Sequence, residues 1–472
     1  MIFSIDIGFE QDYTNIIDNK RVLDVAKAFG ISLNRRSFKI INNLEVDIRA
    51  GDIVYITGES GAGKSLLLKE LVKHISRYDS IFGKVTVEAD ININDDELLI
   101  DSIGRDTEDA IRLLSMVGLN DAYIFLRRYR ELSDGQKYRY RIAKILASNN
   151  SNSRRTLVFD EFCSLLDRDT AKVVAYLLAK VARANKYTLL LATAHDDLEH
   201  DLKPNVIIHK SYGSNISITY NANNNSSNNY NEHKVTCSIL DRIRIEKGGI
   251  NDWQALEEFH YRSGKPFGIK YIFRAVMDSD TIVGVIVYSM PPLSCKGRNI
   301  ALNRVVSAEE VNRDFITISR VVVLPKFRGI GLATLLVKST MPLVGKKYVE
   351  SIAVMGKYNP FFIKAGMKEI VYEPDKKYIL ALRELEKYGF NPVLAASKEY
   401  CYKMLEGMNH NTLTNIVYTV SKIRFAVKNA IGRSREYSTD VLYDKYILAK
   451  AISNIALFAE KKYYYIWHNL HK

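Results

Sequence analysis

Residues 52–75 have the sequence DIVYITGESGAGKSLLLKELVKHI, which indicates the fold of the first part of this chain. Its first residues are mostly apolar and β-branched and end in Gly58, a pattern typical of a buried strand. From Lys64 onward, apolar residues recur at helical spacing, so the pattern predicts a helix over 64–75. The segment between them, GESGAGKS at 58–65, is a glycine-rich turn from strand to helix.

This turn fits the pattern GxxxxGK[ST], which has the chemistry of a phosphate-binding loop. Its glycines let the backbone curl so that N–H groups face phosphate oxygens, and the helix N-terminus adds partial positive charge. Lys64 is predicted to reach the β- and γ-phosphates of ATP, and Ser65 to ligate Mg²⁺. A tight turn without a ligand is the alternative for the motif alone. The predicted ATP-binding residues here are Gly58, Glu59, Ser60, Gly61, Ala62, Gly63, Lys64 and Ser65.

Residues 36–210 alternate apolar, β-rich runs with helical patterns, as α/β proteins do. In TLVFDEF, residues 156–162, Asp160 and Glu161 follow an apolar run, at the strand end where α/β sheets bind ligands. Asp160 is predicted to hold Mg²⁺, and Glu161 to orient or deprotonate an attacking water. Two acids in this position are otherwise common at the start of a helix, but the phosphate loop favours the metal and water roles.

Three more stretches complete an ordered set of motifs. LSDGQ at 132–136 resembles the LSGGQ signature of ABC-type ATPases, SLLDRDTA at 164–171 resembles their D-loop, and His195 resembles their switch histidine. The resemblance implies an ATP-dependent homodimer, in which Ser133, Gly135 and Gln136 of one subunit face the γ-phosphate held by Lys64 of the other. It also implies catalytic roles for Glu161 and His195. A histidine after a strand can alternatively be a buried or capping residue.

The resemblance has gaps. No Gln lies between Gly58 and Ser133, so the Q-loop Gln of the family is absent, and Asp101 is a weak candidate to replace it. Asp134 stands where the second signature Gly is usual. An aromatic residue is expected to stack on adenine, and Phe38 is the candidate upstream.

A second α/β pattern begins near residue 235, after an Asn- and Ser-rich stretch interpreted as a linker. SRVVVLPKFRGIGLATLLV, residues 319–337, predicts a strand, a glycine-containing turn and a helix. Arg328, Gly331 and Ala333 resemble motif A of GCN5-related N-acetyltransferases (GNAT), although a plain strand–turn–helix connection would give the same pattern. The resemblance implies an acetyl-CoA site, with Val321 and Val323 along the pantetheine arm. The pyrophosphate would lie on Arg328, Gly329, Ile330, Gly331, Leu332 and Ala333.

Two other segments, TIVGVIVYS at 281–289 and NPFFIKAGM at 359–367, resemble further parts of that family. The base and acid of acyl transfer are less defined, because the strand before motif A has no Glu and Phe362 occupies the usual Tyr position. Each candidate can instead be a structural or substrate-contacting residue. The candidates are Tyr358, Asn359, His260, Tyr261 and Ser319.

The composition of the chain indicates its number of domains, its cellular compartment and its possible partners. A chain of 472 residues predicts two or three domains, and 47% apolar with 26% charged residues is typical of a globular protein without a membrane span. Four separated cysteines without CxxC favour a reducing cytoplasm. The net charge of +13 fits a nucleic-acid partner or a solvated basic surface. The stretch between Gly407 and Arg435 contains no acidic residue and can likewise be a nucleic-acid-binding segment or a solvated basic surface. Its basic residues are Lys422, Arg424, Lys428, Arg433 and Arg435.

The predicted fold class is therefore α/β: a P-loop ABC ATPase domain, an α/β GNAT-like acyltransferase domain and a basic helical C-terminal extension. The expected boundaries are an N-terminal extension at 1–35, the ATPase at 36–210, the linker at 211–234, the GNAT-like domain at 235–375 and the helical region at 376–472. This order resembles soluble ABC ATPases fused to a predicted acetyltransferase, and the acyltransferase half has a distant likeness to a phage enzyme that modifies adenine in DNA.

Three functional hypotheses follow. The first is ATP hydrolysis coupled to CoA-dependent N-acyl transfer, with nucleic acid or an associated amine as acceptor. The second is an ABC-class nucleic-acid clamp in which the GNAT-like domain only recognises its target. The third, the motor subunit of a membrane importer, is opposed by the fused domain and by the absent Q-loop Gln.

Overall fold

In the computed structural model, the chain is divided into two compact units. Unit 1 comprises Met1–Val287 and Arg320–Thr340, and unit 2 comprises Tyr288–Ser319 and Met341–Lys472. The residues outside the description are 12–18, 32–35, 148–153, 214, 222–235, 261–265, 279, 354–355, 357, 433–437 and 471–472, and the side chains of 9–11 and 36–38. The unit boundaries do not coincide with those predicted at 210, 235 and 375.

The core of the first part of unit 1 is a six-stranded sheet in the order β4-β5-β6-β3-β7-β8. All pairs except β7–β8 are parallel, so most carboxyl ends meet at one edge. The strands are β3 (Ile53–Gly58), β4 (Lys84–Val87), β5 (Arg155–Phe159), β6 (Thr188–Ala192), β7 (Val206–Lys210) and β8 (Ile216–Tyr220).

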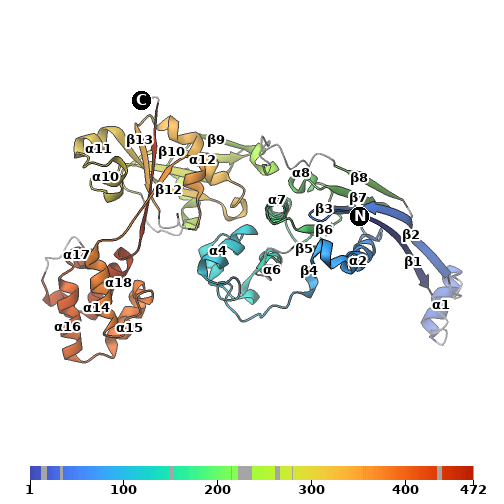
Figure 1. The fold of residues 1–472 in the computed structure, drawn as a ribbon, viewed down its shortest axis with the longest axis horizontal. Coiled ribbons are helices and arrows are strands. Elements are labelled where there is room, and N and C mark those ends of the chain that lie inside the picture. Colours follow the sequence, from blue (N-terminus) through green and yellow to red (C-terminus); the bar gives the residue numbers. More distant parts are fainter. Residues whose placement is uncertain are drawn as a thin grey trace. The chain divides into compact units, whose positions relative to one another are not determined.

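Helices cover this sheet because its central strands are apolar on both faces. In β3, Ile53 and Tyr55 join a core with α6 (Asp134–Ala147) and α7 (Arg168–Asn185). Val54 and Ile56, which alternate with them, join a separate core with α2 (Lys64–Ile75). Period-two alternation thus places α2 and α7 on opposite faces (Figure 1). The strand and helix predicted from residues 52–75 are confirmed.

Two strands lie outside the predicted bounds of the ATPase domain and pair with strands inside them. Residues 1–35 were expected to be an extension, but β1 (Ile2–Gln11) pairs antiparallel with β2 (Arg36–Asp47). Phe3 and Ile5 are buried in the core with α2, because they form the apolar face of β1. The expected linker likewise begins too early, since β8 pairs with β7; its later part, 222–234, lies outside the described residues.

Shorter helices complete this part of unit 1. They are α1 (Lys20–Phe29), α3 (Asp79–Phe82), α4 (Thr107–Met116), α5 (Ala122–Phe125) and α8 (Glu199–Leu202).

A seven-stranded sheet has the order β14-β15-β13-β12-β11-β10-β9. Its strands are β9 (Ile243–Lys247), β10 (Ile269–Met277), β11 (Thr281–Ser289), β12 (Phe315–Val323), β13 (Tyr348–Ile352), β14 (Lys368–Tyr372) and β15 (Lys462–His468). The helices along this part of the chain are α9 (Ile250–Leu256), α10 (Lys296–Leu302), α11 (Ala308–Asp314), α12 (Leu332–Thr340) and α13 (Phe361–Lys364). The strand and helix predicted within residues 319–337 are confirmed as the end of β12 and the start of α12.

The helical region is an insertion into this sheet rather than a terminal extension. Its helices pack around a shared apolar core between β14 and β15, which pair with each other. They are α14 (Lys376–Glu386), α15 (Lys398–Glu406), α16 (His410–Ser421), α17 (Arg424–Ile431) and α18 (Lys445–Phe458). The chain then returns as β15, whose Tyr464 and Tyr465 are fully buried, so the prediction of one helical region over 376–472 is wrong at its end.

Two predictions from composition can be compared with the described residues. No helix among them combines the length and apolarity needed to cross a bilayer. The four cysteines, Cys163, Cys237, Cys295 and Cys401, are free and buried.

Candidate functional site

The phosphate loop adopts a conformation that requires its glycines. Gly58, Gly61 and Gly63 have φ angles of 132°, 79° and 99°. A Cβ on Gly58 would lie 2.0 Å from the carbonyl oxygen of Lys210 on the neighbouring strand β7, which no side chain could tolerate. Gly63 then caps α2, so the loop ends directly at a helix N-terminus.

Lys64 folds back along this loop. Its Nζ donates to the carbonyl oxygens of Gly58 at 2.8 Å and Glu59 at 2.7 Å. Burial lowers the pKa of Lys64 below its ordinary value, and the nearby carboxylates of Asp160 and Glu161 act in the opposite direction. The ammonium group is thus placed at the mouth of the loop, where phosphates would bind.

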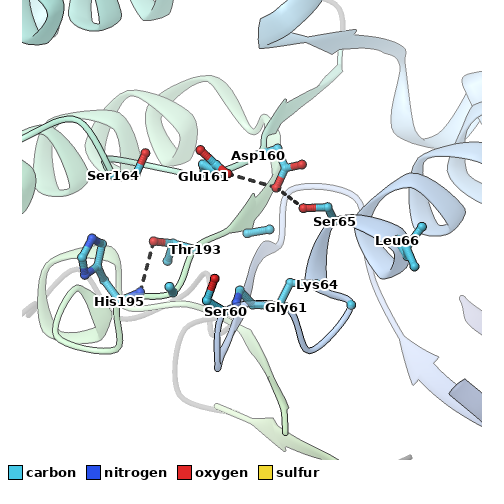
Figure 2. Close-up of a pocket in the computed structure, with 13 residues that line it drawn as sticks. Ser60, Gly61, Lys64, Ser65, Leu66, Asp160, Glu161, Ser164, Thr193 and His195 are labelled. Carbon is cyan, nitrogen blue, oxygen red and sulfur yellow. Dashed lines mark hydrogen bonds between the residues drawn. The ribbon is translucent and has the colours of Figure 1, made fainter. Parts of the chain in front are cut away.

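Ser65 and Asp160 bring oxygen ligands together from two elements. Ser65 Oγ at the start of α2 donates to Asp160 Oδ1 beyond the end of β5, at 2.9 Å (Figure 2). A hydroxyl and a carboxylate beside a phosphate loop are the ligands that Mg²⁺ prefers. The residues present therefore fit the predicted magnesium site.

Glu161 follows in a strained turn. Its φ is 50° and that of Cys163 is 60°, both in the left-handed region that side chains rarely adopt. Glu161 N donates to Asp160 Oδ1 at 3.0 Å, and Cys163 N donates to the hydroxyl of Tyr138 on α6 at 3.0 Å. These bonds hold the Glu161 carboxylate exposed at the edge of the sheet.

His195 is fixed through its backbone. Its N–H donates to Thr193 Oγ1 at 3.2 Å, and its carbonyl oxygen accepts from Thr57 Oγ1 at 3.1 Å and from the hydroxyl of Tyr55. The ring is half-buried at the end of β6 (Figure 2).

These residues line one cavity of about 410 Å³. The predicted residues that line it are Ser60, Gly61, Gly63, Lys64, Ser65, Asp160, Glu161 and His195. Leu66, Ser164, Ala192, Thr193 and Ala194 also line it and were not predicted. Their positions could have indicated them, because each lies close in the sequence to Ser65, Glu161 or His195.

The signature residues lie away from this cavity. Ser133 Oγ accepts from Gln136 N at 3.4 Å, and Gln136 Oε1 accepts from Ser133 N at 3.1 Å, so the pair caps the start of α6. Ser133 and Asp134 are exposed. Asp101 is also exposed and is not among the residues lining the cavity, and the side chain of Phe38 lies outside the description.

The predicted coenzyme A loop is described within unit 1. The Arg328 guanidinium donates to the carbonyl oxygens of Val323 at 2.8 Å, Asn120 at 2.6 Å and Phe259 at 3.0 Å. Gly329 faces the side chain of Leu177, whereas a Cβ on Gly331 would meet nothing within 4 Å. The Arg328 side chain is thus engaged by the protein, and the predicted coenzyme A contacts of the backbone amides from Arg328 to Ala333 stay a prediction.

The acyl-transfer candidates are divided between the units. His260 of unit 1 packs edge-on against Trp253, with ring centroids 6.1 Å apart, and Tyr261 lies outside the described residues. In unit 2, Ser319 Oγ is 2.7 Å from Ser289 Oγ, Tyr358 is half-buried and Asn359 is exposed. No shared constellation of these residues is established.

A parallel sheet with a glycine loop, lysine, serine and paired carboxylates at its carboxyl edge defines a P-loop nucleotide-binding domain. Residues 41–164 match the model of the ABC transporter family. This region is therefore an ABC-class ATP-binding domain, as the motifs predicted.

Curated relatives cover about a third of the chain. The methionine import ATP-binding protein MetN of Clostridium tetani is 29% identical over 205 residues, covering 36% of this chain and 60% of that protein. MetN of Rhizobium meliloti is 32% identical over 204 residues, covering 36% and 54%. The chain thus spans little more than half the length of these relatives. The dimeric ATP-binding cassette MJ0796 with ADP and Pi is 19% identical, with a TM-score of 0.30, covering 39% of this chain and 91% of that one.

Proposed function

We propose that this protein is an ATP-hydrolysing ABC-class ATPase coupled to a CoA-dependent N-acyltransferase domain. The proposed ATP hydrolysis is supported by one cavity, which is lined by Lys64, Ser65, Asp160, Glu161 and His195. Phosphate binding, metal binding and proton transfer each have a suitable group there.

The proposed hydrolysis uses each group once. Lys64 and the loop amides bind the β- and γ-phosphates, and Ser65 and Asp160 hold Mg²⁺, which offsets phosphate charge when bound. A water attacks the γ-phosphorus while Glu161 accepts its proton, and the bond to the ADP oxygen breaks. His195 also lines the cavity, where it can donate to the γ-phosphate.

Two copies are proposed to share each nucleotide. Ser133 is exposed, caps α6 and is absent from the lining of its own subunit's cavity. A helix N-terminus of this kind favours an anion, so the loop of one subunit would complete the pocket of the other. ATP would then hold the dimer together, and hydrolysis would release it.

Support for the acyltransferase half comes from the β12–α12 connection. Gly331 has a φ of 102° and open space beside it, and its carbonyl oxygen accepts from Leu335 N at 3.0 Å, so α12 begins directly at the loop. Such a loop can receive a pyrophosphate on its backbone amides. Nucleic acid or an associated amine is the proposed acceptor, and the cytoplasm the proposed location.

A second candidate is a nucleic-acid clamp with a non-catalytic GNAT-like domain. The bonding of Arg328 to three carbonyls favours it, since that side chain is already committed. In the helical insertion, Lys422 Nζ lies 3.9 Å from the ring centroid of exposed Tyr418, and Phe425 on α17 is also exposed. Basic and aromatic groups together suit a single-stranded nucleic acid.

The names of the curated relatives favour a third candidate, an ATP-binding subunit for methionine import. The sequence opposes it, because the Q-loop Gln is absent between Gly58 and Ser133. Co-purification with a membrane protein would support this candidate.

Titration with acetyl-CoA separates the first two candidates. The full chain is expected to bind acetyl-CoA in calorimetry, and Gly331→Ala to weaken binding at least about tenfold, because a Cβ strains the left-handed backbone and narrows the loop. Gly30→Ala is the matched control, since Gly30 also has a positive φ and open surroundings. Uptake of ATP without uptake of acetyl-CoA would contradict the acyltransferase proposal.

A further inference from the structure

Unit 1 contains a charged contact that the predicted mechanism does not use. Lys326, in the loop after β12, places its Nζ 2.6 Å from Asp167 Oδ1 and 3.1 Å from Asp169 Oδ2. Asp167 caps α7 by accepting from Thr170 N at 3.2 Å. The lysine is therefore bound to the first turn of the helix that follows the Glu161 turn.

The same short segment also reaches the loop of His195. Arg168, between the two aspartates, pairs with Asp197, and its Nε lies 3.2 Å from Asp197 Oδ2. Asp197 comes two residues after His195. Ser164, earlier in the segment, lines the nucleotide cavity. Residues 161–169 thus join both catalytic candidates to the carboxylates that Lys326 holds.

Lys326 is itself held in place. Two residues later, Arg328 donates to the carbonyl oxygens of Asn120 and Phe259, and Gly329 packs against Leu177 of α7. Arg242 adds a second cation, with Nη1 at 2.9 Å from Asp169 Oδ1. The loop after β12 is therefore a fixed support for the start of α7.

Burial and charge agree with a tight contact. Partial burial would lower the pKa of Lys326, but its hydrogen bonds to Asp167 and Asp169 outweigh that effect and raise the pKa. Burial would raise the pKa of Asp167, and the bond from Lys326 helps to bring it below the ordinary value instead. Both groups are charged near neutral pH.

We infer that Lys326 is a positioning residue for ATP hydrolysis: through Asp167 and Asp169 it holds the segment that orients Glu161 and the His195 loop. This inference rests on the proposed ATPase function. Its particular content is that a residue from outside the matched ABC region sets the geometry of the hydrolytic groups, while nucleotide binding stays with the phosphate loop.

The test is steady-state ATP hydrolysis by the full chain. Lys326→Met is expected to lower kcat about threefold to tenfold with little change in KM, and Lys326→Arg to restore most of the rate because it keeps the charge. Lys338→Met on α12 removes an exposed lysine and is the matched control, with an unchanged rate. An unchanged kcat in Lys326→Met would overturn the inference.

A double substitution separates a specific contact from general damage. Asp169→Asn should lower kcat, and adding it to Lys326→Met should cost less than the product of the two single effects, because both substitutions remove the contact between Lys326 and Asp169. Fully multiplicative effects would overturn the inference. If the unaltered protein does not hydrolyse ATP, the proposed function is overturned as well. If it hydrolyses ATP and the Lys326→Met protein does so at the same rate, only this inference is overturned.

Discussion

Replacing Glu161 with Gln is expected to lower kcat for ATP hydrolysis at least about a hundredfold while leaving ATP binding intact, because only the proton acceptor is lost. The phosphate loop, Lys64, Ser65 and Asp160 are untouched by this change. A nucleotide that binds but is not hydrolysed should hold two subunits together. Light scattering with ATP and Mg²⁺ should therefore give twice the mass of the chain.

The matched control is Glu199→Gln, which removes an exposed carboxylate on α8 from outside the cavity lining. It should hydrolyse ATP at the normal rate. A Glu161→Gln protein that binds ATP but stays monomeric would count against the shared site. One that still hydrolyses ATP would remove Glu161 from the mechanism.

The second large effect concerns stability in unit 2, where Glu350 on β13 is fully buried with a full set of partners. Arg298 donates to both of its oxygens, at 3.0 and 2.7 Å. Thr317 Oγ1 donates at 2.9 Å and the hydroxyl of Tyr464 at 2.7 Å. These donors come from α10, β12 and β15, so one carboxylate joins three separate elements around β13.

Glu350→Ala should destabilise unit 2 by about 3–5 kcal/mol, because it leaves the Arg298 guanidinium buried without a countercharge. Amide hydrogen exchange in β13 and β15 measures this, and ATP binding should persist, since the nucleotide cavity belongs to unit 1.

Glu369→Gln on β14 is the control for this prediction. Glu369 accepts one hydrogen bond from Tyr465 at 2.6 Å, so its replacement should cost about 1 kcal/mol. Equal exchange in the Glu350→Ala and Glu369→Gln proteins would show that the buried network does not stabilise the sheet.

Much of the nucleotide site was predictable because its signals are local. The glycines of 58–63 are needed for positive φ, Lys64 and Ser65 start the helix, and Asp160 and Glu161 end a strand. In a parallel sheet, these ends meet at one edge whatever the loops between them do. The residues of these short segments were therefore sufficient to predict where the nucleotide site lies.

The second half of the chain was less predictable because its sheet is built from strands that lie far apart in the sequence. Residues 462–468 are rich in aromatic residues, a pattern that fits either a strand or an exposed binding surface. Only their pairing with β13 and β14 shows that they form a strand. Arg328 fits a ligand-binding motif by sequence, but its three carbonyl partners come from residues 120, 259 and 323. No local pattern indicates such contacts.

If Ser133 of one subunit completes the nucleotide pocket of its partner, mixing two variants that are inactive alone should restore ATP hydrolysis. Lys64→Ala should fail in its own pocket, and Ser133→Arg should block the pocket of its partner. In an equal mixture, half the dimers are mixed and each holds one intact pocket, so about a quarter of the normal ATPase rate should return. A mixture as inactive as its components, or a Ser133→Arg protein that is fully active alone, would show that the two subunits do not share the nucleotide pocket.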